Sequence, residues 1–382
     1  MRFIYADNAA TTPVSAEVLA AMEPFFQESF GNPSSLYSAG RRARRALETA
    51  RETAAACLNA AADELFFTSG GSESDNWALK GVAFSGKTKG KTHLITTKFE
   101  HHAILHACRF LESEGFEVTY LDAHENGIIR PEELEAAIRP DTALVSVMFA
   151  NNEIGTVQPV REIGEICRRH GVLFHSDAVQ AAGTLPIDLK DLNIDLLSLS
   201  AHKFYGPKGI GVLYIRKGTD FVNLIDGGAQ EHSRRAGTEN VAGAVGLAAA
   251  LKAACEHRDE HSAQLISLRD KLTDGLLKIK GSRLNGDRNR RLPGNINIAF
   301  DGVDGETLVL MLDQAGICAS SGSACTAGSS DPSHVLCAIG LPPKLAEGSL
   351  RLTLGVQNTE DDVDGILTLL PGMIDKLRKV QE

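Results

Sequence analysis

Between about residues 60 and 220, short runs rich in β-forming residues alternate with stretches that have the pattern of helices. The β-rich runs are LFFTS 65–69, HLITT 93–97, EVTYL 117–121, ALVSVMF 143–149, VLFHS 172–176, LLSLS 196–200 and VLYIR 212–216. Helical patterns lie between them at 100–114, at 131–138 with a proline in the first turn, and at 160–170 before Gly171. Repeated alternation of strand and helix is typical of a mainly parallel sheet with helices on both faces. The sequence therefore predicts an α/β fold.

The pattern changes after about residue 241. We expect one long helical stretch over 241–279, the short strands NINIAF 295–300 and SLRLTL 349–354, and a last helix over 360–380. The length of 382 residues also suggests more than one domain. We therefore predict a large domain over 16–257 and a smaller α+β domain formed by 258–382 together with 1–15.

Charge and cysteine content argue against several classes of protein. Lys and Arg number 39 against 49 Asp and Glu, and the net charge of −10 disfavours binding to nucleic acid. No stretch approaches the roughly 18 apolar residues that a membrane span needs. Seven cysteines without a CxxC pair predict reduced thiols, and His102 with His106 lacks a third metal ligand nearby. We expect a cytoplasmic protein with no metal, nucleic-acid or membrane partner.

The sequence contains a phosphate-loop pattern, but the elements predicted on either side of it do not suit phosphate binding. Residues 81–88, GVAFSGKT, satisfy the phosphate-loop pattern G-x-x-x-x-G-K-T. That pattern binds phosphate only after a strand and before a helix, whereas here a helical pattern precedes it and a strand follows. Nucleotide hydrolysis is therefore not expected.

Polar residues follow five of the predicted strands at their carboxyl ends. The segments are GGS 70–72, EHH 100–102, NNE 151–153, DAVQ 177–180 and AHK 201–203. In open α/β sheets ligands bind at this edge. Each position alone has an ordinary explanation, since Asp177 could cap a helix and Lys203 could be a surface lysine. Their coincidence predicts one pocket with an anion cradle, a carboxylate, imidazoles and an amine.

These groups match the needs of pyridoxal 5'-phosphate (PLP). Lys203 would supply the amine of a Schiff base, and Asp177 would keep the pyridine nitrogen protonated so that the ring can accept electrons. Gly71 and Ser72, at the start of a helix, would offer backbone amides and a hydroxyl to the phosphate.

Longer motifs connect these residues to a known family. They are YADNAATTP 5–13, GNPSS 31–35, FFTSGGSESDN 66–76, EHHAIL 100–105, NNEIGTVQP 151–159, HSDAVQ 175–180, SAHKFYGPKGIG 200–211, RRAGTEN 234–240, SSGSACTAG 320–328 and LRLTLG 350–355. With them, nearly the whole chain resembles the NifS/IscS-type cysteine desulfurases, which are class V aminotransferase-like PLP enzymes. The resemblance implies the fold type I architecture, with a large domain around a mainly parallel sheet and a smaller α+β C-terminal domain.

The resemblance also implies roles for individual residues. Lys203 would carry PLP, Asp177 and Gln180 would contact the ring, and His101 would stack on the ring and assist proton transfer. The phosphate would be held by Gly71, Ser72, Ser200, His202 and, from the second subunit of a homodimer, Thr238. Asn152 would contact both the cofactor and the substrate.

Arg351 would join Asn152 in holding the substrate carboxylate. In the predicted strand 349–354, Leu350, Leu352 and Leu354 share one face and Arg351 lies on the other. An arginine on that face is ordinarily solvated, but its guanidinium can also bind a carboxylate through two hydrogen bonds.

Cys325 is the candidate nucleophile. It lies in SSGSACTAGSS 320–330, whose small polar residues cannot bury a side chain, so we expect an exposed thiol on a flexible segment. The implied activity is removal of sulfur from L-cysteine to give L-alanine and a persulfide on Cys325, for iron–sulfur cluster or thio-cofactor synthesis. The acceptor would be a protein such as an iron–sulfur scaffold, although the chain ends at Glu382 without the C-terminal extension on which housekeeping relatives dock theirs.

Two other functions stay open at this point. The first is a related PLP enzyme, namely a selenocysteine lyase or an aminotransferase, and an aminotransferase would not need Cys325. The second is a sulfur-carrier or assembly platform without turnover, against which the intact set of Lys203, Asp177 and Cys325 argues.

Overall fold

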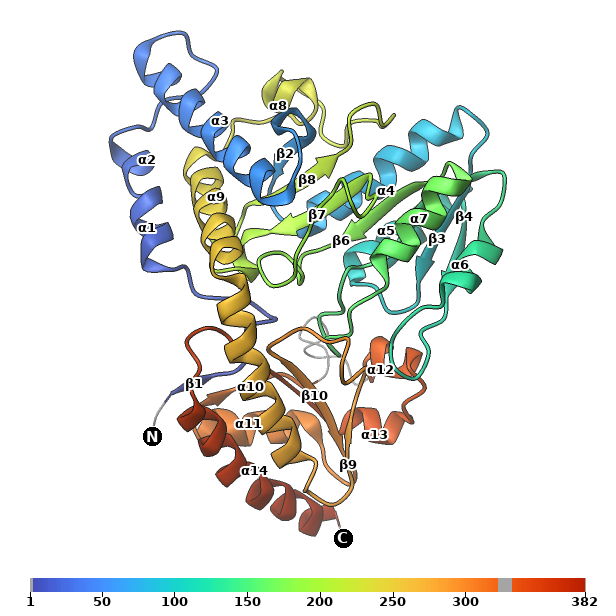
Figure 1. Ribbon diagram of the computed structural model, residues 1–382, viewed down its shortest axis with the longest axis vertical. Coiled ribbons are helices and arrows are strands. Elements are labelled where there is room, and N and C mark those ends of the chain that lie inside the picture. The colour runs from blue at the N-terminus through green and yellow to red at the C-terminus, as the bar shows by residue number, and fades with distance from the viewer. Residues whose placement is uncertain (1–2, 322–331, 382) are drawn as a thin grey trace.

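The computed structural model describes residues 3–321 and 332–381 of the chain. Cys325 lies outside the described residues. Two sheets of different size, each with its own helices, occupy opposite ends of the molecule (Figure 1).

The larger sheet has seven strands in the order β2-β8-β7-β6-β5-β3-β4. Its strands are β2 (Leu65–Thr68), β3 (His93–Thr97), β4 (Glu117–Leu121), β5 (Thr142–Ser146), β6 (Leu173–Asp177), β7 (Leu196–Ser200) and β8 (Gly211–Ile215). The neighbours from β4 to β7 pair in parallel, and β8 runs antiparallel to both β7 and β2. The predicted mainly parallel sheet is therefore confirmed, with one antiparallel strand inserted near its edge.

Both faces of this sheet are covered by helices. Successive strand residues point to opposite faces, so Leu144 joins one apolar cluster and Val145 the other. One cluster includes helices α4 (Gly71–Lys87) and α5 (His102–Ser113), and the other includes α3 (Ser38–Leu58), α7 (Val160–His170) and α9 (Val241–Glu256). Burial on two sides explains why β2, β5 and β8 are rich in apolar residues on both faces.

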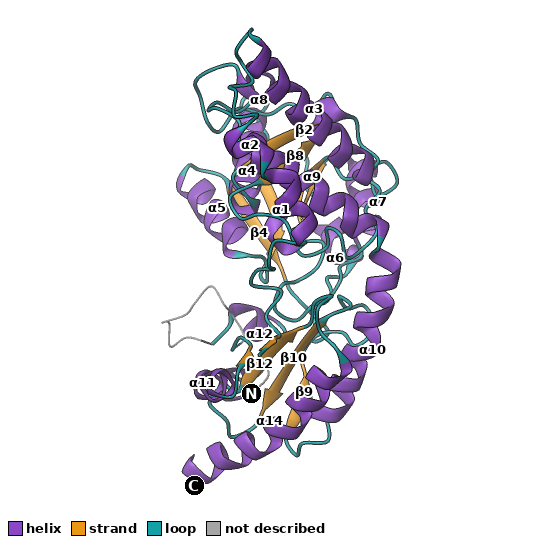
Figure 2. Cartoon of the chain, turned by 90° about the vertical axis from the view of Figure 1, so that its left-hand side faces the viewer, coloured by secondary structure: helices purple, strands orange, loops and turns teal. Residues whose placement is uncertain are grey.

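The smaller sheet has three antiparallel strands in the order β12-β10-β9, with bounds β9 (Ser282–Leu284), β10 (Asn295–Phe300) and β12 (Ser349–Thr353). Helices α10 (Arg258–Leu276), α11 (Gly305–Gln314) and α14 (Glu360–Gln381) contribute to its separate apolar core. The N-terminal strand β1 (Ile4–Tyr5) pairs in parallel with β11 (Ile317–Cys318), and Ile4 belongs to the same core. Figure 2 shows these elements grouped below the larger sheet and its helices.

The remaining elements are short. They are α1 (Ala16–Met22), α2 (Pro24–Gln27), α6 (Pro131–Ala137), α8 (Gln230–Ser233), α12 (His334–Ala338), α13 (Pro343–Glu347) and the 3-10 turns η1 (Ala62–Glu64) and η2 (Ala201–Lys203). Within 3–321 and 332–381, no helix combines the length and apolar character needed to cross a bilayer.

The long helix predicted over 241–279 is divided in the structure. α9 ends at Glu256, His257 leaves the helical conformation with φ −102° and ψ 6°, and α10 begins at Arg258. α9 packs on the larger unit, whereas α10 packs on the smaller one, so one straight helix would not serve both cores. We propose that the boundary between a large domain, 16–257, and a small domain, 1–15 with 258–382, lies at this break.

The phosphate-loop pattern of residues 81–88 is helical rather than a loop. Residues up to Lys87 belong to α4, and the indole of the same helix, Trp77, donates a hydrogen bond to the Val222 carbonyl at 3.1 Å. The amides of residues 81–87 are therefore directed along a helix and cannot surround a phosphate.

A buried ion pair fastens the segment that contains α8. Arg51 of α3 donates to both carboxylate oxygens of Glu231 at 2.7 and 2.8 Å, and each side chain is 2% exposed. Glu231 also accepts the amide of Phe67 at 2.8 Å. Its φ of 45° is in the left-handed region, as is that of His232 at 56°, a conformation that costs energy in residues other than glycine. The ion pair therefore holds a strained turn in place.

We expect Arg51→Met to lower the free energy of unfolding by about 3–5 kcal/mol, because it leaves the Glu231 carboxylate buried without a cation. The control is Arg161→Met, which breaks an exposed pair with Asp191 and should cost about 1 kcal/mol or less. Denaturant unfolding of the proteins without cofactor measures both. Equal losses for the two variants would contradict the prediction, and Arg51→Met with Glu231→Gln should recover part of the loss.

Candidate active site

A cavity of about 380 Å³ lies at the edge of the larger sheet where its parallel strands end. Of the residues predicted to bind cofactor or substrate, it is lined by Gly71, Ser72, His101, Asn152, Asp177, Gln180, Ser200, His202, Lys203 and Arg351. They come from α4, the start of α5, the ends of β6 and β7, and β12 of the smaller sheet. The cavity thus brings together residues that are almost 300 positions apart in the sequence.

Lys203 brings an amine to the cavity from η2, directly after β7. Its Nζ atom donates hydrogen bonds to the backbone carbonyls of Ala9 and Ala10 at 2.6 and 2.8 Å. Gln180 donates to the same Ala9 carbonyl at 3.0 Å. The N-terminal segment therefore positions both predicted cofactor residues.

Asp177 is the last residue of β6 and is 6% exposed. Burial raises the pKa of its carboxyl to about 6, while the Val179 amide, which donates to its Oδ1 at 2.9 Å, and the Lys203 ammonium favour the charged form. A buried carboxylate with few partners of its own would be stabilised by a protonated ring nitrogen. This arrangement fits the predicted role of Asp177.

His101 caps α5, because its Nδ1 accepts the Ala103 amide at 3.2 Å. Burial, followed by the charge of Lys203, lowers the pKa of the imidazole to about 4. His101 is therefore neutral near pH 7, with Nδ1 engaged and the proton on Nε2. A neutral imidazole at the cavity wall can stack on a flat ring without adding a positive charge beside Lys203.

The predicted anion cradle is built at the start of α4. Gly71 is the first residue of this 17-residue helix, and a Cβ atom there would lie 2.7 Å from Cγ2 of Val179. Ser72, Ser200 and His202 line the cavity beside it and also border an adjoining hollow of about 400 Å³. Backbone amides at a helix N-terminus and hydroxyl groups are the donors that a phosphate group needs.

Taken together, the residues present fit PLP. The cavity has an amine, a buried acid, a neutral imidazole and a helix N-terminus at separate positions, which are the groups that hold the aldehyde, the ring nitrogen, the ring face and the phosphate of that cofactor. Its volume lies in the range of small-molecule sites.

Arg351 is buried at 1% exposure, although it lies on the strand face opposite the core leucines. Its guanidinium donates to Asp7 Oδ1 at 2.8 Å, to the Asn152 carbonyl at 3.1 Å and to Ser320 Oγ at 3.2 Å. Its Nε–H is also buried and has no hydrogen-bond partner in the described residues. Arg351 therefore brings an oriented cation to the cavity wall, which suits a substrate carboxylate.

Two predicted residues are not placed in this cavity. Thr238 is exposed in the segment between α8 and α9 and is not among the described residues that line the cavity. Cys325, as noted, is outside the described residues. Their predicted roles remain predictions.

Two acids of the cavity region were not predicted from the sequence. Asp7 pairs with Arg351, and Asp75 of α4 lines the cavity at 1% exposure. Both belong to motifs quoted above, YADNAATTP and FFTSGGSESDN, but no spacing argument separates them from neighbouring polar residues. His102 stacks on His106 with ring centroids 5.1 Å apart, and no group of three potential ligands in the described chain is arranged to hold a metal ion.

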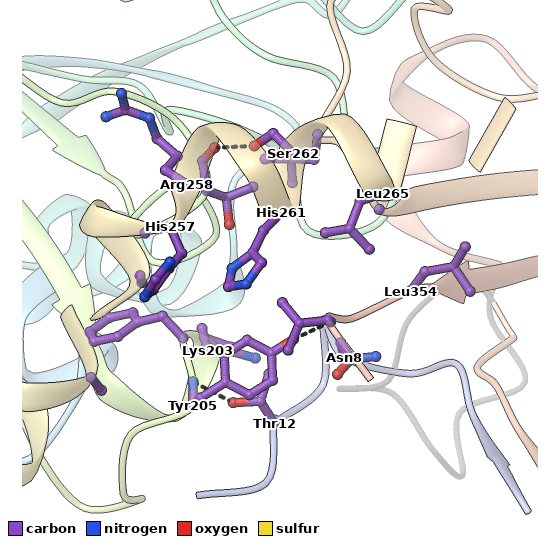
Figure 3. A pocket seen from close by; sticks show the side chains of 18 of the residues that line it. Asn8, Thr12, Lys203, Tyr205, His257, Arg258, His261, Ser262, Leu265 and Leu354 are labelled. Carbon is purple, nitrogen blue, oxygen red and sulfur yellow. Dashed lines mark hydrogen bonds between the residues drawn. The ribbon is translucent and has the colours of Figure 1, made fainter. Parts of the chain in front are cut away.

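A second cavity of about 310 Å³ adjoins the first at Lys203, Gln180 and Ala9. It lies beside the break between α9 and α10, where His257 and His261 line it and His261 points toward Tyr205 (Figure 3). Its lining contains neither Asp177 nor Arg351. The cofactor and the substrate carboxylate are therefore better accommodated in the first cavity.

Comparison with known proteins agrees with this arrangement. The family profile "Aminotransferase class-V" matches residues 4–366. A protein of Methanosarcina thermophila named cysteine desulfurase IscS is 55% identical over 377 residues, which are 99% of this chain and 93% of that protein. A solved structure described as a NifS-like protein has a TM-score of 0.93 at 40% identity, and the match covers 98% of this chain and 100% of that one.

A second solved structure, "SspA in complex with cysteine", has a TM-score of 0.82 at 41% identity and covers 93% of this chain and 100% of its own. The sequence profile, the curated relative and both structures agree over nearly the full length of the chain. The chain therefore belongs to the aminotransferase class-V family, in its group of NifS/IscS-type cysteine desulfurases.

Proposed function

We propose that the protein is a PLP-dependent cysteine desulfurase that converts L-cysteine to L-alanine and leaves the sulfur as a persulfide on Cys325. The observation that carries the proposal is the convergence of Lys203, Asp177, His101 and Arg351 on one cavity in a chain whose relatives are cysteine desulfurases. No second binding set of this kind lines the other cavity described above.

Binding of the substrate would rest on Arg351 and Asn152. The Nε–H of Arg351 has no hydrogen-bond partner within 3–321 and 332–381, and its other donors are held by Asp7 and by the Asn152 carbonyl, so the guanidinium is fixed before the substrate arrives. A carboxylate that reaches this donor would turn the α-carbon of the amino acid toward Lys203.

Proton movements would then be divided between two groups. PLP, when bound, supplies an electron sink that stabilises negative charge on the substrate's α-carbon. Lys203 Nζ would remove the α-proton, because it is the amine on the cavity wall. His101, which is neutral near pH 7, would accept the proton of the Cys325 thiol, since the thiolate is the nucleophile.

In the sulfur-transfer step the Cys325 thiolate would attack Sγ of the substrate. A sulfur–sulfur bond forms on Cys325, and the Cβ–Sγ bond breaks with its electron pair on the carbon fragment. Protonation of that fragment gives alanine, so no external oxidant or reductant is needed to form the persulfide. A second thiol, on a sulfur acceptor protein such as an iron–sulfur scaffold, would then take the sulfur by exchange. We place this chemistry in the cytoplasm, where thiols stay reduced.

The experiment that tests the function measures alanine and sulfide after addition of L-cysteine and a thiol reductant. The purified protein should be yellow and should form the two products in equal amounts. Selenocysteine and a keto acid are the comparison reactants. Activity on selenocysteine alone would favour a lyase for that substrate, and amino transfer to the keto acid would favour an aminotransferase.

A substitution at Arg351 separates substrate binding from cofactor binding. We expect Arg351→Lys to raise KM for L-cysteine roughly 10- to 100-fold, because a charged hydrogen bond worth about 1.5–3 kcal/mol is lost. The visible absorbance of the bound cofactor should not change. A loss of that absorbance together with activity would show that Arg351 serves the cofactor instead.

A homodimer with shared sites is also part of the proposal. Thr238 is exposed in its own chain, and Phe26, Phe30 and Leu36 are 60%, 73% and 83% exposed, which leaves apolar surface for a partner to cover. Light scattering should give twice the chain mass of 40.9 kDa.

Mixing two inactive variants tests the contribution of Thr238 across the dimer. Thr238→Glu would repel the phosphate, and Lys203→Ala removes the amine. A mixed dimer regains one intact site only when Thr238 acts on the partner's cofactor. Absence of recovered activity in isolated mixed dimers would show that Thr238 acts within its own chain.

A further inference from the structure

A second buried carboxyl group lies beside Asp177 and has no role in the proposed reaction. Asp75, in the second turn of α4, is 1% exposed and lines the same cavity. Its Oδ1 atom is buried without a hydrogen-bond partner in the described chain. A carboxylate anion in this position would lack the hydrogen bonds that a buried charge requires.

Among the described residues, no cation acts on Asp75. The Ser198 hydroxyl of β7 favours the charged form of Asp75. His175 of β6 lies with Nε2 at 3.7 Å from Asp75 Oδ1. The ring of His175 is held between Ser198 Oγ at 3.0 Å and Ser146 Oγ at 2.9 Å. Burial lowers the pKa of this imidazole to about 3, so His175 does not supply a positive charge.

The other titratable groups that act on Asp75 are acids. Asp177 faces it from the end of β6, and Glu100 faces it from the segment before α5. Burial, and then the charge of Asp177, raise the pKa of Asp75 well above its ordinary value. Asp177 differs because the Lys203 ammonium and the Val179 amide favour its charged form. The two carboxyl groups therefore have unequal environments.

We propose that Asp75 is a positioning residue that acts as an uncharged carboxylic acid and leaves Asp177 as the single anion opposite the ring nitrogen of the cofactor. Two carboxyl groups in one buried cavity do not both ionise, and the proton stays on the one that has no cation. Asp75 would thereby fix the location of the negative charge under the ring, with Ser198 and His175 completing an uncharged network beside it. The part of this inference that concerns the ring nitrogen rests on the proposed function.

The first test uses the protein without cofactor and is independent of the proposed function. An acid whose native pKa is raised binds its proton more tightly in the native state, so its contribution to stability is lost as pH rises above the unfolded pKa of about 4. Asp75→Asn keeps the shape of the neutral acid and cannot ionise. The quantity to compare is the unfolding equilibrium constant of the wild type divided by that of Asp75→Asn. This ratio should rise by about tenfold for each pH unit over which Asp75 is protonated in the native state but ionised in the unfolded state.

Denaturant unfolding at several values between about pH 5 and pH 8 measures that ratio. The contribution of Glu100, whose pKa is also raised by burial, to about 8, is common to both proteins and cancels. A ratio that does not change with pH means that Asp75 ionises at an ordinary pKa, which would overturn the proposal. If the side chain of Asp75 had only a structural role, Asp75→Asn would lower the free energy of unfolding by the same amount at every pH.

The second test uses the protein loaded with PLP and follows the pH dependence of its visible absorbance. Asp75→Asn should have the same midpoint pH of the absorbance change as the wild type. Asp177→Asn should shift this midpoint by at least about one pH unit, because only Asp177 is the charged partner of the ring. A displacement by Asp75→Asn as large as that by Asp177→Asn would overturn the proposal. If no protein shows the absorbance of bound PLP, the proposed function fails, while the unfolding test still decides the charge of Asp75.

Discussion

Replacing Lys203 with alanine should abolish the visible absorbance of the bound cofactor and lower desulfurase activity by on the order of 10⁴-fold or more. Lys203 is the amine that the cavity presents beside Asp177 and His101, and losses of this size are typical when one member of a cooperating catalytic set is removed. The measurements are the absorbance spectrum and the rate of alanine formation. The fold should be retained, because Lys203 lies at the wall of a cavity and its Nζ donates to backbone carbonyls of the N-terminal segment rather than packing in an apolar core.

A control lysine separates this effect from a general loss of positive charge. Lys89 is exposed and pairs with Asp220 far from the cavity, so Lys89→Ala should change neither the spectrum nor the rate. Borohydride reduction followed by peptide mapping identifies the modified lysine directly. Attachment of the cofactor to Lys208, which borders the adjoining hollow, would overturn the assignment of Lys203.

Replacing Cys325 with serine should separate cofactor binding from sulfur transfer. We expect the spectrum of bound PLP, and its change on addition of L-cysteine, to persist, because neither needs the thiol. The rates of alanine and sulfide release should fall by more than about a hundredfold, since the oxygen of serine is a poor nucleophile toward sulfur. The matched control is Cys337→Ser, which removes an exposed thiol on α12, twelve positions along the chain, and should leave the rates unchanged.

Persulfide labelling after brief exposure to L-cysteine gives a second measure of the same prediction. The label should appear on Cys325 before the other six cysteines. Cys108 and Cys167 are buried, and burial raises the pKa of both thiols to about 12, so they contain little thiolate at neutral pH. Labelling elsewhere, or near wild-type turnover by the serine variant, would favour direct elimination of sulfur from the substrate.

Most secondary structure was predictable because buried faces produce periodic patterns of apolar residues, and chain reversals favour residues such as glycine. The helix expected over 160–170 is observed as Val160–His170, and Gly171 ends it with φ of 63°, a conformation that glycine adopts without strain. The strand expected over 295–300 is observed as Asn295–Phe300. The break at His257 was not predictable, since the residues around it favour a helix and the break depends on which of two cores each half contacts.

The sequence by itself determined the α/β fold, the family and the chemical character of the site. Strand–helix alternation specifies the sheet, and the ends of parallel strands meet at one edge, so the sequence assigns Asp177 and Lys203 to one pocket. The long motifs indicated PLP as the cofactor and Cys325 as the candidate nucleophile, because the residues that serve this reaction occur in a recognisable order along the chain.

The tertiary structure decided what each of these groups contacts, and hence which groups are charged. Arg351, expected on the strand face opposite the leucines, is buried against Asp7, a residue 344 positions away, and the pairing appears only when the N-terminal segment packs beside β12. Asp75 is one of several polar residues in its motif, and only the packing of α4 beneath the sheet's edge removes it from water and from any cation in the described chain. Pairing and burial depend on distances between segments remote in sequence, and these distances set the protonation state of a carboxyl group.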